Sequence, residues 1–232
     1  MYKDNRKKLV LTRVMLIMVL FVIACLVIML QQDKQNEVVK IGVIDSPLEY
    51  RYVSKYDIVY IKKVTTDPLT TNHGSVVLSI IKQNNDAKVY YASMLDNSLK
   101  ASIDDVANAI YWCVEKKVNI INMSFATTED NPSLREAIQY ALSKKIIIVA
   151  SCINYYDGYS YPAMYNGVIS VSDGGFNKST IVVNKQTYTV KLLDGNITKT
   201  SCTSCATAYV TNQISMELAG ERKEYITKLI QN

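Results

Sequence analysis

The chain has 232 residues, of which 49% are hydrophobic, and its formal net charge at pH 7 is +5. This length suits one ordinary domain with an appendage, and it is enough to bury a sizeable core. Beyond the basic N-terminus, Lys and Arg are scattered among acidic residues and form no stripe interleaved with aromatic side chains, so we expect no nucleic-acid partner.

The N-terminal segment predicts a membrane anchor. Residues 1–13 form a basic tail, residues 14–30 carry no charge, and residues 31–37 form a short polar linker. The apolar run from Leu9 to Leu30 is about long enough for a bilayer, which requires roughly 20 residues. The basic tail predicts a single-pass helix with the N-terminus inside and residues 38–232 outside the cytoplasmic membrane. Two alternatives remain open: a cleaved signal peptide, and a lipoprotein cut at the lipobox-like Val22-Ile23-Ala24-Cys25.

Apolar runs then alternate with segments of helical period, which predicts an α/β fold with a mostly parallel sheet flanked by helices. One helix is expected to begin at a cap formed by Ser102 and Asp105, and another at a cap formed by Ser133 and Glu136. Several of the expected strands are apolar on both faces, as in a buried parallel sheet. They are Val38–Ile44, Ile58–Ile61, Lys88–Ala92, Val118–Met123, Ile146–Ala150 and Val168–Val171.

Polar residues follow three of these strands. Asp45, Ser124 and Asn154 each come at or soon after a strand's carboxyl end. Sites in open α/β sheets gather just beyond those ends, so we expect the three side chains to lie at one edge.

His73 is the only histidine of the chain, and it stands between Asp45 and Ser204 in sequence. Asp, His, Ser is one of the chain orders known for a nucleophilic triad. A serine hydroxyl needs a base to take its proton, which suits His73, and the imidazole needs an acceptor, which suits Asp45. The Asn154 amide and the Ser204 N–H are candidate donors to an oxyanion.

Six segments in order make the chain resemble a subtilisin-like serine protease, or subtilase, from about Val38 to Glu217. They match the family's Asp, His, Asn-Met-Ser, oxyanion, Tyr-Pro-Ala and Ser blocks. The segments are Ile41-Gly42-Val43-Ile44-Asp45-Ser46-Pro47, His73-Gly74-Ser75-Val76-Val77, Ile120-Ile121-Asn122-Met123-Ser124-Phe125-Ala126, Val149-Ala150-Ser151-Cys152-Ile153-Asn154, Tyr161-Pro162-Ala163 with Val168-Ile169-Ser170-Val171, and Cys202-Thr203-Ser204-Cys205-Ala206-Thr207-Ala208-Tyr209-Val210.

The resemblance implies that Asp45, His73 and Ser204 form the triad and that Asn154 donates to the oxyanion. It also implies that an extended peptide binds as an added strand. One wall would be Ser124-Phe125-Ala126, and the other would lie near Ser98 to Ala101.

The chain departs from the family pattern at four glycines, which are replaced by Pro47, Ala126, Ile153 and Cys202. Ala126 and Ile153 would narrow the primary specificity pocket, so we expect a small residue at the cleavage position. Cys202 adds bulk beside the nucleophile. No span before Asp45 is long enough for the inhibitory propeptide of many subtilases, and we expect no metal ion or cofactor.

The external cysteines, Cys113, Cys152, Cys202 and Cys205, are too few for a disulfide scaffold or a zinc site. We interpret them as small buried hydrophobic residues. A bridge between Cys152 and Cys202 is the alternative, because the predicted compartment permits disulfides.

Together these observations predict a membrane-tethered extracytoplasmic serine endopeptidase that makes limited cuts in a peptide or protein substrate. The lost glycines favour an alternative, a catalytically degenerate subtilase fold that binds a peptide or a membrane partner. An unrelated α/β esterase is disfavoured because Ser204 lacks both glycines of Gly-x-Ser-x-Gly.

Overall fold

The computed structural model describes residue 15 and residues 18–24, 38–62, 71–153, 158–174, 181–183 and 186–220. The chain divides into two compact units, Met1–Glu37 and Val38–Asn232. In the first unit, residues 18–24 are helical. Within the described residues, no helix combines the length and apolar character needed to cross a membrane. Most of the anchor expected at residues 14–30, and the whole linker at 31–37, lie outside the described residues.

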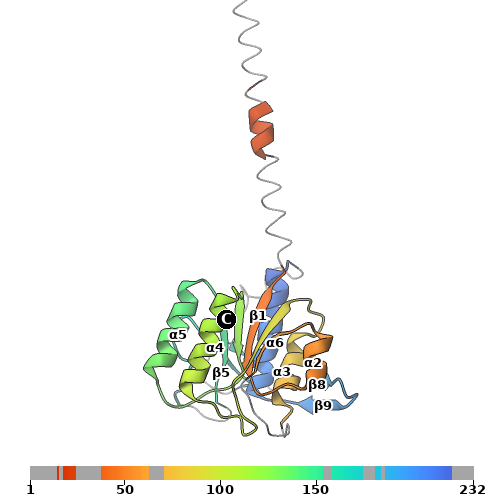
Figure 1. The fold of residues 1–232 in the computed structure, drawn as a ribbon, viewed down its shortest axis with the longest axis vertical. Coiled ribbons are helices and arrows are strands. Elements are labelled where there is room, and N and C mark those ends of the chain that lie inside the picture. The colour runs from red at the N-terminus through yellow and green to blue at the C-terminus, as the bar shows by residue number, and fades with distance from the viewer. Residues whose placement is uncertain are drawn as a thin grey trace, which may run out of the picture. The chain divides into compact units, whose positions relative to one another are not determined.

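The second unit is built on a seven-stranded sheet in the order β2-β3-β1-β4-β5-β6-β7, and every neighbouring pair is parallel (Figure 1). The expected α/β architecture is confirmed, since the six expected strands match β1 to β6 to within two residues at each end. The strands are β1 (Lys40–Asp45), β2 (Val59–Lys62), β3 (Lys88–Ser93), β4 (Ile120–Met123), β5 (Ile147–Ser151), β6 (Ile169–Ser172) and β7 (Ile181–Val182).

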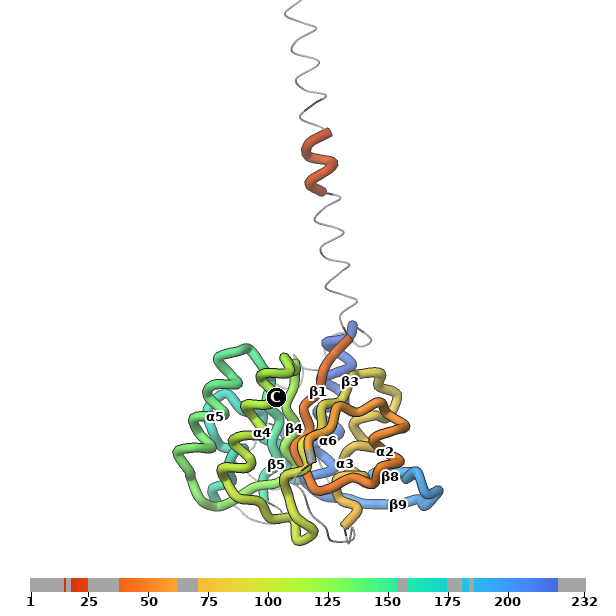
Figure 2. The backbone as a smooth tube through the Cα atoms, in the orientation of Figure 1, coloured from red at the N-terminus to blue at the C-terminus, as the bar shows by residue number. Residues whose placement is uncertain are grey.

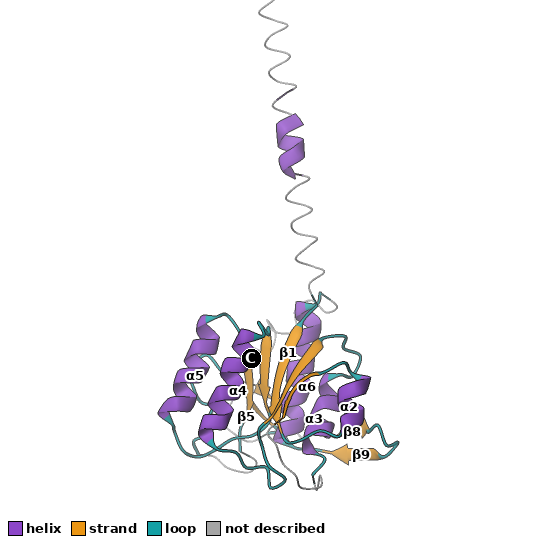
Figure 3. Ribbon diagram, in the orientation of Figure 1, coloured by secondary structure: helices purple, strands orange, loops and turns teal. Residues whose placement is uncertain are grey.

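Helices cover both faces of this sheet (Figure 3). One face packs against α3 (His73–Ile81) and α6 (Thr203–Leu218), and the other against α4 (Ile103–Glu115) and α5 (Pro132–Ser143). Strand side chains alternate between the two cores, so that Val43 of β1 joins the first core and Ile44 joins the second. Both faces are buried, which explains why the strands read as continuous apolar runs.

The two predicted helix caps have different outcomes. Ser102 caps α4 as expected, because its hydroxyl accepts a hydrogen bond from the Asp105 N–H at 3.1 Å. The cap predicted at Ser133 is wrong, because the N-cap of α5 is Asn131, whose side chain accepts from the Ser133 and Leu134 N–H groups. Pro132 takes the first helical position, where its fixed φ is favourable and its missing N–H costs nothing.

Three features were not expected from the sequence. They are the two-residue strand β7, the short helix α2 (Tyr50–Lys55), and an antiparallel hairpin of β8 (Tyr188–Lys191) and β9 (Ile197–Thr200). Figure 2 shows the hairpin beside α2, and the Leu193 N–H donates to the Tyr52 hydroxyl at 3.1 Å. The hairpin ends at Thr200, and α6 begins at Thr203 after its N-cap residue, Cys202.

Candidate active site

The carboxyl ends of β1 and β4 bring two of the predicted site residues together. Ile44 pairs with Met123 in the parallel register, so Asp45 and Ser124 are the next positions along neighbouring strands. Neighbouring strands lie about 4.8 Å apart. Asp45 is fully buried and Ser124 is almost so. The third residue predicted at this edge, Asn154, lies outside the described residues.

Asp45 binds the imidazole of His73, the first residue of α3. The Asp45 Oδ1 lies 2.7 Å from the His73 Nδ1, and it also accepts the Ser46 N–H at 2.7 Å. The His73 side chain is 21% exposed, so the ring is reachable from solvent. Burial lowers the pKa of His73, but the charge of Asp45 and its hydrogen bond raise it, and the net result is a pKa above the ordinary 6.5. The pair therefore has the geometry needed to orient a general base.

Gly74 allows α3 to press against the end of β1. Its N–H donates to the Ser46 hydroxyl at 2.9 Å, and the buried Tyr91 hydroxyl donates to the Ser46 carbonyl at 2.7 Å. A Cβ at position 74 would lie 2.1 Å from the Tyr91 hydroxyl oxygen and 2.7 Å from the Ser46 carbonyl oxygen. Only glycine fits at position 74 without a shift of its neighbours. The close approach of α3 to β1, and with it the position of His73, therefore requires a residue without a Cβ at this point. The pKa of Tyr91 lies well above its ordinary value because burial, and then the charge of Asp45, disfavours the phenolate.

Ser204 lies in the first turn of α6 and is held against the end of β4. Its hydroxyl donates to the Ser124 carbonyl at 2.8 Å, and the Ser124 hydroxyl reaches the Ser204 carbonyl at 3.2 Å. Behind them, the Asn122 Oδ1 lies 3.0 Å from the Ser124 hydroxyl and is the second of two acceptors for its single proton, and the Asn122 amide donates to Thr211 of α6 at 2.9 Å. Since β4 neighbours β1, this network places the Ser204 hydroxyl at the same sheet edge as Asp45 and His73.

The N–H of Ser204 has the character expected of an oxyanion donor. It is one of the first N–H groups of α6, which have no partner inside their own helix. Within the described part of the chain, no acceptor is bonded to it. The sequence also assigned a donor role to Asn154, on which the described residues carry no information.

A cavity of about 290 Å³ lies between the two segments expected to hold a substrate. One wall contains Phe125, Ala126 and Thr127, and the facing wall contains Leu99, Lys100 and Ala101. Its base is apolar, formed by side chains that include Leu95, Ile103, Val106 and Leu134. Ser98 does not line this cavity. Ile153, expected in the primary specificity pocket, is half-buried and its N–H donates to the Ser160 hydroxyl at 3.2 Å.

The cysteines pair differently from the alternative raised by the sequence. Cys202 and Cys205 form a disulfide, so a bridge between Cys152 and Cys202 is wrong. Cys152 and Cys113 are free and buried, as small hydrophobic residues would be. Burial raises the pKa of the Cys152 thiol to about 11 and that of Cys113 to about 12. The interpretation of Cys202 and Cys205 as small buried hydrophobic residues is therefore wrong. Their C-x-x-C spacing is the signal that could have indicated the bridge, because it places the two residues within one helical turn.

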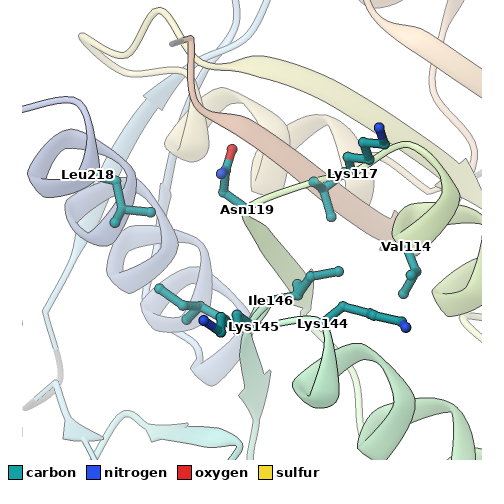
Figure 4. Close-up of a pocket in the computed structure, with 9 residues that line it drawn as sticks. Val114, Lys117, Asn119, Lys144, Lys145, Ile146 and Leu218 are labelled. Atoms are coloured by element: carbon teal, nitrogen blue, oxygen red, sulfur yellow. The ribbon is translucent and has the colours of Figure 1, made fainter. Parts of the chain in front are cut away.

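A larger cavity, of about 540 Å³, lies away from this site, at the amino ends of β4 and β5 (Figure 4). Lys117, Lys144 and Lys145 are at its rim, but their side chains point in different directions in Figure 4. They do not converge on one position, as the donors of an anion site would. Among the described residues, Asp45, His73 and Ser204 lie instead at the carboxyl ends of the strands.

Comparison with known proteins identifies the family. A model of the subtilase family matches residues 36–179. The chain belongs to the subtilase family. The prediction of a subtilisin-like serine protease is thus confirmed at the level of the family, and the relatives that match this subtilase bear the names of serine proteases.

Three curated relatives illustrate the likeness. An intracellular serine protease of Paenibacillus polymyxa is 32% identical over 99 residues, which are 40% of this chain and 30% of the relative. Thermitase of Thermoactinomyces vulgaris is 32% identical over 97 residues, covering 40% of this chain and 35% of thermitase. The major intracellular serine protease of Bacillus subtilis is 40% identical over 72 residues, covering 28% and 23%. The matched stretches therefore span about a third or less of the length of these relatives.

Two solved structures share the fold over most of this subtilase. The protease domain of PatA, solved as a point mutant, superposes with a TM-score of 0.66 at 19% identity and covers 79% of this chain and 80% of that one. The prenylagaramide maturation protease PagA gives 0.67 at 20% identity, covering 79% and 76%. At this level of identity the likeness concerns the fold.

Proposed function

We propose that this subtilase is a membrane-tethered serine endopeptidase in which Ser204 is the nucleophile, His73 the general base and Asp45 the group that orients it. The observation that carries the proposal is the Asp45–His73 hydrogen bond of 2.7 Å at the same sheet edge as the Ser204 hydroxyl, which is bonded to Ser124. Asp45 and His73 are bonded to each other, Ser204 is bonded to the strand beside β1, and each of the three supplies one of the groups that acyl transfer requires.

The reaction begins when the Ser204 hydroxyl turns its proton from the Ser124 carbonyl to the neutral imidazole of His73. The oxygen attacks the peptide carbonyl, and Asp45 stabilises the imidazolium that forms. The Ser204 N–H and the Asn154 amide donate to the oxyanion of the tetrahedral intermediate. His73 then gives its proton to the leaving amine, and water releases the acyl group by the reverse sequence.

The substrate is a peptide or protein segment that binds in extended form between Phe125-Ala126-Thr127 and Leu99-Lys100-Ala101. The apolar base of the cavity between these walls suits an apolar side chain of the substrate. Ala126 and Ile153 stand where the family has glycine, so the residue at the cleaved bond is small. Both features restrict the sequences that fit, which favours limited processing over general digestion.

The tether is the uncharged segment at residues 14–30, and the basic tail before it keeps the N-terminus in the cytoplasm. The peptidase domain then lies outside the cytoplasmic membrane.

Carbonate washing of membranes tests the tether: an integral protein stays in the pellet, and release of the protein into the supernatant contradicts the tether. Protease added to intact spheroplasts should digest residues 38–232; protection of this domain contradicts the orientation.

An active-site label tests the catalytic proposal. A fluorophosphonate probe should label the full chain in detergent, and Ser204→Ala should abolish the labelling. Ser201→Ala is the matched control, because Ser201 is exposed, lies three positions before the nucleophile and should label like the parent. In other subtilases, loss of the nucleophile costs about 10⁶ in turnover.

The same experiment separates the alternative function. Well-folded protein that no probe labels, and that still binds peptides, would be a catalytically degenerate binder. Parent-level labelling of Ser204→Ala would show instead that another serine is the nucleophile.

A further inference from the structure

The disulfide between Cys202 and Cys205 encloses the nucleophile. Cys202 is the N-cap of α6, Cys205 lies in its first turn, and only Thr203 and Ser204 stand between them. The bridge therefore restricts the backbone that carries the Ser204 hydroxyl and its N–H. It also accounts for a side chain at position 202, where the family pattern has glycine.

The two cysteine residues differ in exposure, as the residues of a redox-active pair do. Cys202 is partly exposed, whereas Cys205 is 2% exposed. The Cys202 Sγ accepts the Cys205 N–H at 3.2 Å, and the N-terminal end of α6 favours negative charge at that sulfur. The Thr200 Oγ1 lies 3.9 Å from the Cys202 Sγ and 3.7 Å from the Cys205 Sγ. A C-x-x-C motif at the start of a helix is an environment that stabilises a cysteine thiolate.

We propose that Cys202 and Cys205 are a thiol–disulfide exchange site whose redox partner is a dithiol protein or small dithiol, and that the oxidised form is the active protease. The second part rests on the proposed function. In reduction, a thiolate of the partner attacks the Cys202 Sγ, the bond between the two cysteines breaks, and the Cys205 sulfur leaves as a thiolate and is protonated. The partner's second thiol then attacks its own sulfur in the mixed disulfide and releases Cys202. Two electrons pass to the bridge, and the partner becomes a disulfide.

Reduction alters catalysis because it frees the segment that must be held. With the bridge closed, Thr203 and Ser204 are confined between two linked positions. With it open, Ser204 keeps two described contacts outside its own helix, the hydrogen bonds that join its hydroxyl and its carbonyl to Ser124. A displacement of about 1 Å in a catalytic group can cost about 10²-fold in rate. We expect reduction to lower the rate of fluorophosphonate labelling by about ten- to a hundredfold.

Thiol mapping tests the exchange site without reference to proteolysis. The native full chain is treated with dithiothreitol or with thioredoxin, alkylated and analysed by mass spectrometry. Cys202 and Cys205 should become alkylated, whereas the buried Cys113 and Cys152 should stay unmodified until the protein is unfolded. A bridge that resists both reductants in folded protein would overturn the proposal and show a structural disulfide.

Labelling in both redox states tests the link to activity. The oxidised parent should label faster than the reduced parent, and re-oxidation should restore the rate. The double variant Cys202→Ser with Cys205→Ser should label at the reduced rate under both conditions, and Cys152→Ser should behave like the parent. Equal rates for oxidised and reduced protein overturn the link to activity. Absence of labelling in both states, with the bridge exchanging normally, contradicts the proposed function and leaves the exchange site established.

Discussion

The contact around Gly74 gives the sharpest test of how the site is assembled. In Gly74→Ala, the new methyl would lie 2.1 Å from the Tyr91 hydroxyl oxygen, where ordinary contact begins at about 3.4 Å. Either the phenol or the start of α3 must move by about 1 Å. Overpacking of this kind costs about 1–3 kcal/mol of stability. If the helix moves, the hydrogen bond between His73 and Asp45 is lost, and we expect fluorophosphonate labelling to fall by about 10².

A second substitution shows which atom causes the effect. Tyr91→Phe removes the oxygen nearest to the new methyl, so Gly74→Ala with Tyr91→Phe should label faster than Gly74→Ala alone. The Ser46 carbonyl oxygen, at 2.7 Å, would still be close, so the rescue should be partial. Gly42→Ala is the matched control, because its Cβ would meet the Cys113 sulfur at 2.6 Å, away from the site. It should lower the urea midpoint and leave labelling per folded molecule unchanged. Parent-level labelling of Gly74→Ala would refute the reasoning.

Four further predictions concern other parts of the site. Asp45→Asn should reduce turnover by about 10⁴, as the corresponding change does in other serine proteases, and a decrease below tenfold would contradict its role. The acid limb of the pH–labelling profile should lie above pH 6.5, because Asp45 raises the pKa of His73 and only the neutral imidazole accepts a proton; in Asp45→Asn that limb should move to lower pH. Asn154→Ala should slow turnover by about 10²–10³ with Ser204 still labelled, and unchanged turnover would remove its assignment as oxyanion donor. Asn122→Ala should cost about 1–3 kcal/mol in urea unfolding, because buried partners lose their hydrogen bonds.

The central sheet could be predicted from sequence because its signal is local. Strands buried on both faces are apolar throughout, and the chain offers six such runs, most of them separated by helices. The seventh strand, β7, has only two residues and carries no such signal. The same pattern predicted that Asp45 and Ser124 lie at one edge of the sheet, because the carboxyl ends of parallel strands share that edge. The pairing of Asp45 with His73 did not follow from periodicity and was indicated by chain order and family resemblance.

Other features depend on contacts that no local pattern encodes. Helix α2 has no side-chain cap hydrogen bond, and its buried residue, Tyr52, accepts a hydrogen bond from the Leu193 N–H between β8 and β9. The hairpin itself carried a readable signal, Asp194-Gly195 between alternating residues, which is typical of a tight turn. The cap of α5 could also have been assigned to Asn131, because Pro132 suits the first helical position. The requirement for glycine at position 74 needs the position of Tyr91, which only the structure supplies.

The location of Ser204 in α6 has a consequence for biosynthesis. During translation, Asp45 of β1 is synthesised first and His73 of α3 soon afterwards. Ser204 follows only after the β8–β9 hairpin has been synthesised. Until α6 docks on β4, the growing polypeptide holds the proposed base without its nucleophile. The proposed triad therefore forms only after all seven strands of the central sheet have been synthesised.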